Sequence, residues 1–137
     1  MSTEQIIQPA NIDYDFLMRT LQNAGMQAEL KNERIILTNG KTKATVRILT
    51  DVITFFSYYK IKPDVERQKL LEMIYGLNQP SSFNISSITK NQERLSISMA
   101  YLTSSGVFIP HFIHTINGFF AFQRISLKKN NLSDILE

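Results

Sequence analysis

The two histidines, His111 and His114, are the residues whose type and spacing most resemble part of a metal site. A spacing of three on a helix puts both imidazoles on one side, where together they could bind a metal ion. A stable site needs a third ligand, and the sequence has no Asp or Glu between Arg94 and Asp134. We therefore predict no metal site and no cofactor, and we expect both imidazoles to be surface side chains.

Nucleophilic catalysis has equally little support in the sequence. The chain has no cysteine, which excludes a thiol nucleophile, a thiolate zinc site and a disulfide framework. None of its serines lies in a G-x-S-x-G motif, and neither of the common glycine-rich phosphate loops is present. Serine pairs at hairpin and helix boundaries are ordinary turn and capping residues. We predict that the protein is not an enzyme.

Basic residues are concentrated in one part of the chain. Residues 31–62 carry a net charge of +5, more than the +3 of the whole chain. Lys41, Lys43 and Arg47 alternate along one face of a predicted strand, with Arg34 expected opposite them. Such a face could bind nucleic acid, phosphates or an acidic protein segment, although charged outer faces also keep sheets from aggregating. Nucleic-acid or phosphate binding is therefore our alternative prediction of function.

The predicted strand over residues 52–61 has apolar side chains on both faces. Its first face carries Ile53, Phe55, Tyr59 and Ile61, and its second face carries Val52, Phe56 and Tyr58. Only one face of a strand packs against the helices of its own layer. An aromatic second face must be covered by a subunit or a loop, or else it is a binding surface. We predict Phe56 and Tyr58 as protein-binding residues.

The last predicted helix has two apolar sides as well. Its core side is formed by Ile109, Phe112, Ile113, Ile116, Phe119 and Phe120. A second stripe recurs at steps of four, three, four and three, and consists of His111, Thr115, Gly118, Phe122 and Ile125. This stripe suits a partner helix or a homodimer interface, because Gly118 lets another backbone come close. We predict a protein-binding or dimer interface at Thr115, Gly118, Phe122 and Ile125. In the alternative, the N-terminal lead or Leu132, Ile135 and Leu136 cover these residues and those of the strand.

The elements that position these residues begin with a helix and a meander of strands. Helical spacing begins at Tyr14, with Asp13 or Asn11 as the N-terminal cap and Gly25 at the C-terminal end. Four segments of period two follow, over residues 26–30, 33–39, 41–50 and 52–61. We predict two-residue turns at Lys31-Asn32 and at Asn39-Gly40, the second as a type I′ turn with positive φ at both central residues. The four strands read as an antiparallel meander.

A second helix, a hairpin and a third helix complete the predicted order. Pro63 opens a helix over residues 64–77. The buried stripe of this helix is predicted to be Val65, Leu70, Leu71, Ile74 and Leu77. Residues 83–89 and 93–103 form a hairpin, and the last helix runs from after Gly106 to about Leu127. The order α-β-β-β-β-α-β-β-α pairs strands as hairpins, which predicts an α+β fold with an antiparallel sheet and its helices on one face.

The length of 137 residues favours about one domain. We expect a loose N-terminal lead over residues 1–12, the domain over residues 13–127 and a polar C-terminal tail over residues 128–137. No segment reaches the roughly 18 apolar residues of a membrane helix. The N-terminus lacks the basic start and apolar core of a signal peptide. We therefore expect a soluble, cytoplasmic protein.

Three short motifs accompany this order of elements. They are Ala24-Gly25 before the first strand, Tyr75-Gly76-Leu77-Asn78 at the end of the second helix and Ser105-Gly106-Val107 before the last helix. With these motifs, residues 14–127 resemble the YbjN family of small bacterial proteins. The resemblance implies the fold of type III secretion chaperones, in a family labelled as sensory-transduction regulators. With the apolar stripes, it leads us to predict a non-enzymatic protein-binding domain, chaperone-like or regulatory, whose partner is another protein or a second copy of itself.

Overall fold

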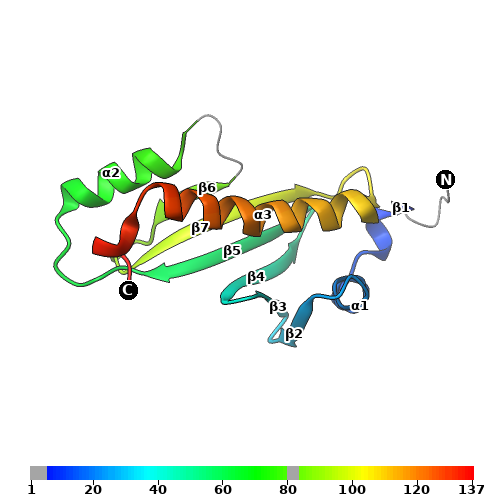
Figure 1. Cartoon of the computed structure of the whole chain (residues 1–137). Helices are drawn as coiled ribbons and strands as arrows, with labels where there is room; N and C mark the ends of the chain where they lie inside the picture. Colours follow the sequence, from blue (N-terminus) through cyan, green and yellow to red (C-terminus); the bar gives the residue numbers. More distant parts are fainter. Residues whose placement is uncertain (1–5, 80–83) are drawn as a thin grey trace. The chain divides into compact units, whose positions relative to one another are not determined.

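The computed structural model describes residues 6–79 and 84–137, and it has the predicted α+β fold with an antiparallel sheet and three α-helices (Figure 1). The helices are α1 (Tyr14–Asn23), α2 (Arg67–Leu77) and α3 (Ile109–Lys129), with short 3₁₀ helices η2 (Pro9–Asn11) and η3 (Leu132–Asp134). The strands are β1 (Ile6–Ile7), β2 (Gln27–Lys31), β3 (Arg34–Asn39), β4 (Thr42–Leu49), β5 (Val52–Lys60), β6 (Ile85–Ile88), β7 (Arg94–Leu102) and β8 (Val107–Phe108). None of the described helices is long and apolar enough to cross a membrane.

Six strands form one sheet in the order β2-β3-β4-β5-β7-β6, and β1 pairs separately with β8. The chain divides into two compact units. Unit 1 consists of Met1–Phe55 and Ala100–Asn117, and unit 2 consists of Phe56–Met99 and Gly118–Glu137. Because β5, β7 and α3 contribute residues to both units, the properties of each unit are described in turn.

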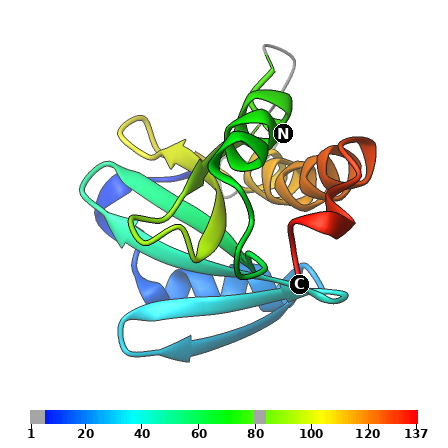
Figure 2. The ribbon, with the colours of Figure 1, turned by 90° about the vertical axis from the view of Figure 1, so that its left-hand side faces the viewer.

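The first helix of unit 1 begins and ends where the sequence predicts. Asp13, rather than Asn11, is the cap, because its carboxylate accepts a backbone N–H of the first turn at 2.8 Å. Gly25 follows the helix with a φ of +83°, the left-handed conformation that ends many helices. Leu17 and Leu21 are fully buried, and α1 lies beside β2 and β3 (Figures 1 and 2).

The core of unit 1 is built from the inner faces of its strands. Successive strand residues point to opposite faces, so every second side chain is buried. These fully or almost fully buried residues are Ile35, Leu37, Ala44, Val46, Ile53 and Phe55. The Phe55 ring packs on Phe112 at the start of α3, with the ring centroids 6.2 Å apart. The predicted core side of this part of α3 is therefore confirmed at Phe112 and Ile116, which are both fully buried.

The first hairpin turn of the meander lies one residue later than predicted. Lys31 pairs with Arg34, so the central residues are Asn32 and Glu33. Their φ angles of +47° and +59° are both positive, as a type I′ turn requires. The sequence alone does not place this turn, because residues 31–34 are all polar and offer no period to set the register.

The second hairpin turn also differs from its prediction by one residue. Asn39 pairs with Thr42, so Gly40 and Lys41 are the central residues. Only Gly40 of this pair has a positive φ, at +61°, which is typical of a type II′ turn rather than the predicted type I′. The register is fixed instead by burial, since it places Leu37 opposite Ala44 on the inner face.

The predicted loose N-terminal lead contains ordered structure within the described residues, which begin at Ile6. Ile6 pairs with Phe108 and Ile7 with Val107 in an antiparallel ladder. This pairing requires the glycine at position 106, where φ is +93° and a Cβ would lie only 2.9 Å from the carbonyl oxygen of Ile7. Two-residue strands are too short to show a period, which is why the sequence does not reveal them.

The helix of unit 2 begins at Arg67, later than the predicted residue 64. Asp64 has a φ of +63°, in the left-handed region, so the chain turns there before the helix can begin. The buried stripe is then Leu70, Met73 and Leu77. Leu71, predicted to be buried, is 49% exposed.

The predicted hairpin of unit 2 is confirmed as β6 and β7, whose register pairs Ser86 with Ile97. The predicted start of its first strand, residue 83, lies outside the described residues. Leu95, Ile97 and Met99 are buried, as their alternation predicts. Phe119 and Phe120 of α3 are also buried, which confirms the predicted core side of the helix in this unit.

The C-terminal residues of unit 2 pack against the end of β5. Leu132 and Ile135 are buried, and Leu136 forms an antiparallel bridge with Ile61. The backbone N–H of Lys62 donates to the Ile135 carbonyl at 2.7 Å. The stretch predicted as a polar tail therefore closes one edge of unit 2, through apolar side chains spaced too sparsely to show a period.

Candidate functional site

The outer face of β5 in unit 2 carries two stacked aromatic rings. Phe56 and Tyr58 lie two residues apart, their ring centroids are 6.2 Å apart and their planes differ by only 8°. Tyr58 is 44% exposed and Phe56 is half-buried. On the opposite face of the strand, Ser57 is buried and Tyr59 is half-buried. Two rings held side by side offer a rigid apolar surface that loses little conformational entropy when it binds.

Arg94, the first residue of β7, completes this surface. Its guanidinium lies over the Tyr58 ring, 4.8 Å from the centroid, in a cation–π contact. The contact holds the ring in place and adds a positive charge at the edge of the apolar surface. We call Phe56, Tyr58 and Arg94 the aromatic platform.

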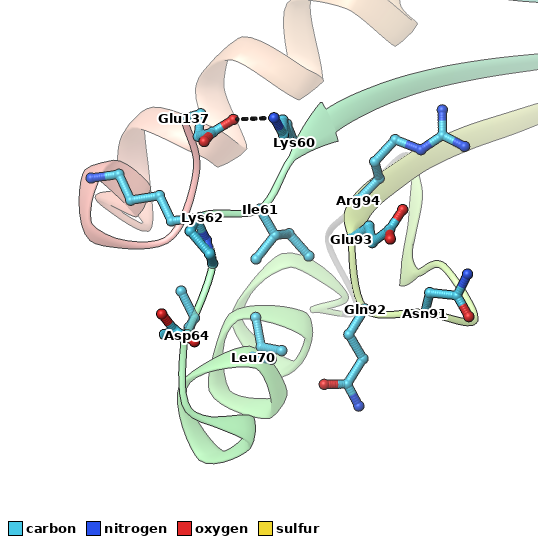
Figure 3. A pocket seen from close by; sticks show the side chains of 12 residues that line it. Lys60, Ile61, Lys62, Asp64, Leu70, Asn91, Gln92, Glu93, Arg94 and Glu137 are labelled. Carbon is cyan, nitrogen blue, oxygen red and sulfur yellow. Dashed lines mark ion pairs between the residues drawn. The ribbon is translucent and has the colours of Figure 1, made fainter.

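Arg94 also lines the rim of a cavity of about 700 Å³ in unit 2 (Figure 3). Ile61 and Leu70 face each other at its centre, Gln92 and Glu93 lie on one side, and Lys62 lies on the other. The other lining residues are Lys60, Pro63, Asp64, Val65, Asn91 and Glu137. The cavity therefore has apolar side chains within and polar groups of both signs around them, a composition suited to an apolar side chain on a polar chain.

The two lysines of this cavity are already bonded within the chain. Lys60 forms an ion pair with Glu137 at 3.3 Å, and the Lys62 ammonium donates to the Ser133 carbonyl at 2.7 Å. The Lys60 pair is largely exposed, so it contributes little to stability. Both contacts nevertheless direct the ammonium groups toward the C-terminal segment, and an incoming phosphate would have to displace these contacts.

The second predicted stripe lies on the solvent side of α3. Phe122 is 41% exposed and Ile125 is 60% exposed, so the C-terminal residues of unit 2 do not cover them. Gly118 is half-buried in unit 2. Thr115, in unit 1, is half-buried, and its hydroxyl donates to the His111 carbonyl of its own helix at 2.8 Å.

Within unit 2, the aromatic platform and the α3 stripe do not form one surface. Buried Gln123 of α3 reaches the inner face of β5, where it donates to the Ser57 hydroxyl at 3.1 Å and accepts from the Tyr59 hydroxyl. Because strand residues alternate, Phe56 and Tyr58 point away from α3. A single contact cannot bury both predicted sets of residues, so unit 2 has two separate apolar surfaces.

The two histidines are not gathered with other ligands. No group of three His, Cys, Asp or Glu side chains within the described ranges could hold a metal ion. His111 instead contacts Tyr101 of β7, with 3.2 Å between the Tyr101 hydroxyl and Nδ1. Burial raises the pKa of the Tyr101 hydroxyl above its ordinary value, so this hydroxyl keeps its proton at neutral pH. We interpret the pair as a structural contact between β7 and α3 in unit 1.

The predicted basic residues are only partly gathered on one strand face of unit 1. Lys43 and Arg47 are exposed on β4, and Arg34 is exposed at the start of β3. Lys41 lies in the turn before β4 rather than on the strand face where the prediction placed it. The exposed residue Lys31 of β2, which pairs with Arg34, was missed as a neighbour of this group.

Two features of unit 2 were not predicted from the sequence. Arg94 meets Tyr58 across two strands that are far apart in the chain, so no local spacing connects them. Leu71 and Tyr75 form an exposed apolar pair on α2, with Tyr75 77% exposed. Their spacing of four residues was available as a signal, but it equally suits a buried stripe.

No protein-family model and no curated protein matches the sequence. Among solved structures, YbjN from E. coli, described as a candidate transcription regulator, resembles the chain with a TM-score of 0.77. The alignment covers 92% of this chain and 96% of that one, at 15% identity. The chain has a YbjN-like fold. The resemblance predicted from the sequence is therefore confirmed at the level of the fold.

A chain of the HopA1-SchA chaperone-effector complex shares the fold as well. Its TM-score is 0.61 at 10% identity, and the alignment covers 86% of this chain and 95% of that one. At such identities the likeness concerns the arrangement of the backbone and does not extend to individual side chains. Function must therefore be argued from the surfaces of the YbjN-like fold in this chain.

Proposed function

We propose that this chain is a non-enzymatic protein-binding domain, chaperone-like or regulatory, that binds its partner through the aromatic platform. The observation that carries the proposal is the stacked pair of Phe56 and Tyr58, exposed on a strand and held by Arg94. Tyr and Arg are among the residues that contribute most of the free energy at protein interfaces. The solved chaperone-effector complex with this fold supports a protein as the partner.

The cavity beside Arg94 extends the same surface. A partner segment that covers Tyr58 can place an apolar side chain against Ile61 and Leu70 while its backbone remains among polar groups. Full burial of the Tyr58 ring would contribute about 1.5–3 kcal/mol to binding. We therefore expect the partner to make contact through an apolar segment. Arg94, at the edge of the platform, should favour acidic residues beside that segment.

A second copy of the chain is the other partner that we consider, through Gly118, Phe122 and Ile125. The exposure of Phe122 and Ile125 supports this hypothesis. Light scattering tests it directly: a dimer that becomes a monomer in Phe122→Asp supports the hypothesis. A wild-type chain that stays monomeric at every concentration contradicts it.

The aromatic platform is tested by capturing the partner protein from host lysate with the wild-type chain. The affinity of the purified partner is then measured for the wild-type chain and for two variants. Tyr58→Ala should weaken binding at least about tenfold, because one buried ring is lost. Tyr75→Ala, at an exposed tyrosine on α2, is the matched control and should bind as wild type. Equal affinity of all three proteins would contradict the proposal.

The salt dependence of the same measurement separates apolar contact from phosphate binding. Affinity through the aromatic platform should change little between about 50 and 200 mM salt, whereas phosphate contacts lose affinity steeply over that range. A steep loss, removed by replacing Arg34, Lys43 and Arg47 with Gln, would favour the nucleic-acid alternative. The outer face around these basic residues on β3 and β4 carries no aromatic side chain for stacking bases, which favours the protein-binding function.

A further inference from the structure

Part of the outer edge of β6 in unit 2 is hydrogen-bonded to a side-chain amide instead of a neighbouring strand. β6 is the last strand of the sheet order, so one of its edges has no strand partner within residues 6–79 and 84–137. Asn78, directly after α2, donates to the Ser86 carbonyl at 2.6 Å and accepts from the Ser86 N–H at 2.7 Å. Its amide thus makes the two bonds that a neighbouring strand would make.

Two residues further along β6 the same edge is open. Backbone groups of an antiparallel strand alternate between its two sides, so the N–H and C=O of Ile88 point the same way as those of Ser86. The next residue confirms the alternation, since the Thr89 N–H donates to Arg94 on the β7 side. Ile88 is only half-buried, and no side chain of the described part of the chain caps its backbone as Asn78 caps Ser86.

An apolar groove lies directly beside this open edge. A cavity of about 370 Å³ is lined on the β6 side by residues 86–90 and on the α2 side by Leu70, Leu71 and Ile74. Leu71 is half exposed and Ile74 half-buried, so the helix presents apolar surface to the groove. Figure 1 shows α2 running alongside β6, with which it is in contact.

The charged side chains that line the groove are all positive. Arg67, the first residue of α2, and Lys90, just after β6, both line it at the end away from Asn78. The lining includes no Asp or Glu, and neither cation forms an ion pair within residues 6–79 and 84–137. A ligand that fits this end carries a negative charge.

The geometry points to a binding site for an extended segment of a partner protein, with apolar residues at alternate positions and an acidic residue at the Arg67–Lys90 end. The segment adds to the open edge of β6, bonds to the backbone of Ile88 and places its alternate side chains against Leu71 and Ile74. The inference rests on the proposed protein-binding function and names the chemistry of the segment that is bound.

The test uses a fluorescein-labelled peptide, Glu-Thr-Leu-Thr-Leu-Thr-Glu, followed by fluorescence anisotropy with the full chain. A glutamate at each end places one beside Arg67 and Lys90 in either strand direction. We expect this peptide to bind, and the same peptide with Lys in place of both Glu to bind about tenfold more weakly. N-methylation of the central Leu-Thr amides should also weaken binding about tenfold, because the backbone bonds to Ile88 are lost.

Variants of the chain locate the peptide. Leu71→Asp should weaken binding at least about tenfold, whereas Tyr75→Asp on the same helix, outside the groove lining, should not. If Leu71→Asp does not fold, Arg67→Glu with Lys90→Glu leaves the apolar groove intact and should reverse the preference between the Glu and Lys peptides. The proposal is wrong if neither peptide binds, or if both bind every variant equally.

Two outcomes separate this proposal from the function on which it rests. A wild-type dimer that Leu71→Asp converts to a monomer in light scattering would show that a second copy occupies the groove, and would overturn the peptide site. Tyr58→Ala could weaken binding of the captured partner while no peptide binds the chain. That result would support the aromatic platform and contradict the groove proposal.

Discussion

β5 passes through both units of the chain, and its two halves use their faces differently. In unit 1 its inner face is apolar, with Ile53 and Phe55 fully buried, and its outer face carries Val52 and Thr54. In unit 2 its inner face is polar, with Ser57 and Tyr59 bonded to Gln123, and its outer face carries the aromatic platform. The strand keeps one period throughout, and in its second half the outer face carries two aromatic rings, Phe56 and Tyr58.

The two units differ in how much apolar surface they expose on the outer face of β5. Unit 1 buries the Phe55 ring of the strand and displays charges around its outer face, an arrangement that favours stability and discourages strand pairing. Unit 2 satisfies a buried polar network inside and leaves Phe56 and Tyr58 half covered outside. Exposed aromatic surface of this kind adds little to the core, which supports the binding role proposed for it.

The largest expected effect comes from the buried ring of unit 1. Phe55→Ala should lower the free energy of unfolding by about 3–5 kcal/mol, because it leaves a cavity against Phe112. Urea denaturation followed by circular dichroism measures the change. The neighbouring outer-face variant Phe56→Ala should cost about 1 kcal/mol. Equal losses at the two positions would contradict the difference between the faces.

An intermediate effect is expected from the buried network of unit 2. Gln123→Leu should lower the free energy of unfolding by about 1–3 kcal/mol, because the hydroxyls of Ser57 and Tyr59 lose their buried partner. Chemical denaturation again provides the measurement. The double variant Gln123→Leu with Tyr59→Phe should recover part of the loss, since it also removes the Tyr59 hydroxyl that bonds to Gln123. A double variant less stable than the sum of the single changes would argue against the network.

The smallest effect is expected at the platform itself. Arg94→Ala should lower stability by only about 0.5–1 kcal/mol, the contribution of an exposed cation–π contact to Tyr58. Thermal unfolding compared with Arg94→Lys, which keeps the charge, measures it. A loss as large as that of Phe55→Ala would mean that the platform is part of the core and would remove the contrast between the two units.

Several elements could be predicted from the sequence because their signals are local. Asp13 and Gly25 mark the ends of the first helix through capping chemistry, which involves only neighbouring residues. The alternation along β5 separates its buried face from its outer face correctly. The start of α2 could not be predicted, because the left-handed conformation of Asp64 has no strong signature in an aspartate.

The exposure of four candidate site residues was predicted, but their arrangement was not. Phe56, Tyr58, Phe122 and Ile125 are all exposed to some degree, as the apolar excess implies. Their division into separate surfaces depends on Gln123, whose contact with β5 joins residues 64 and 66 positions apart. Lys41 was placed on a strand face because its alternation with Lys43 continues into the turn, where period two has no structural meaning.

The amino-acid sequence alone predicts the order of the three helices and of the strands of the six-stranded sheet, the inner face of each long strand and an excess of apolar side chains over what one core can bury. These follow from periodicity and capping, which act between residues a few positions apart. Three features depend on the tertiary structure: Arg94 lies over Tyr58, Ile135 and Leu136 close the edge beside Ile61, and Ile88 lies at an open groove. Each of these depends on which distant segments become neighbours, and that choice is made by the packing of the whole fold.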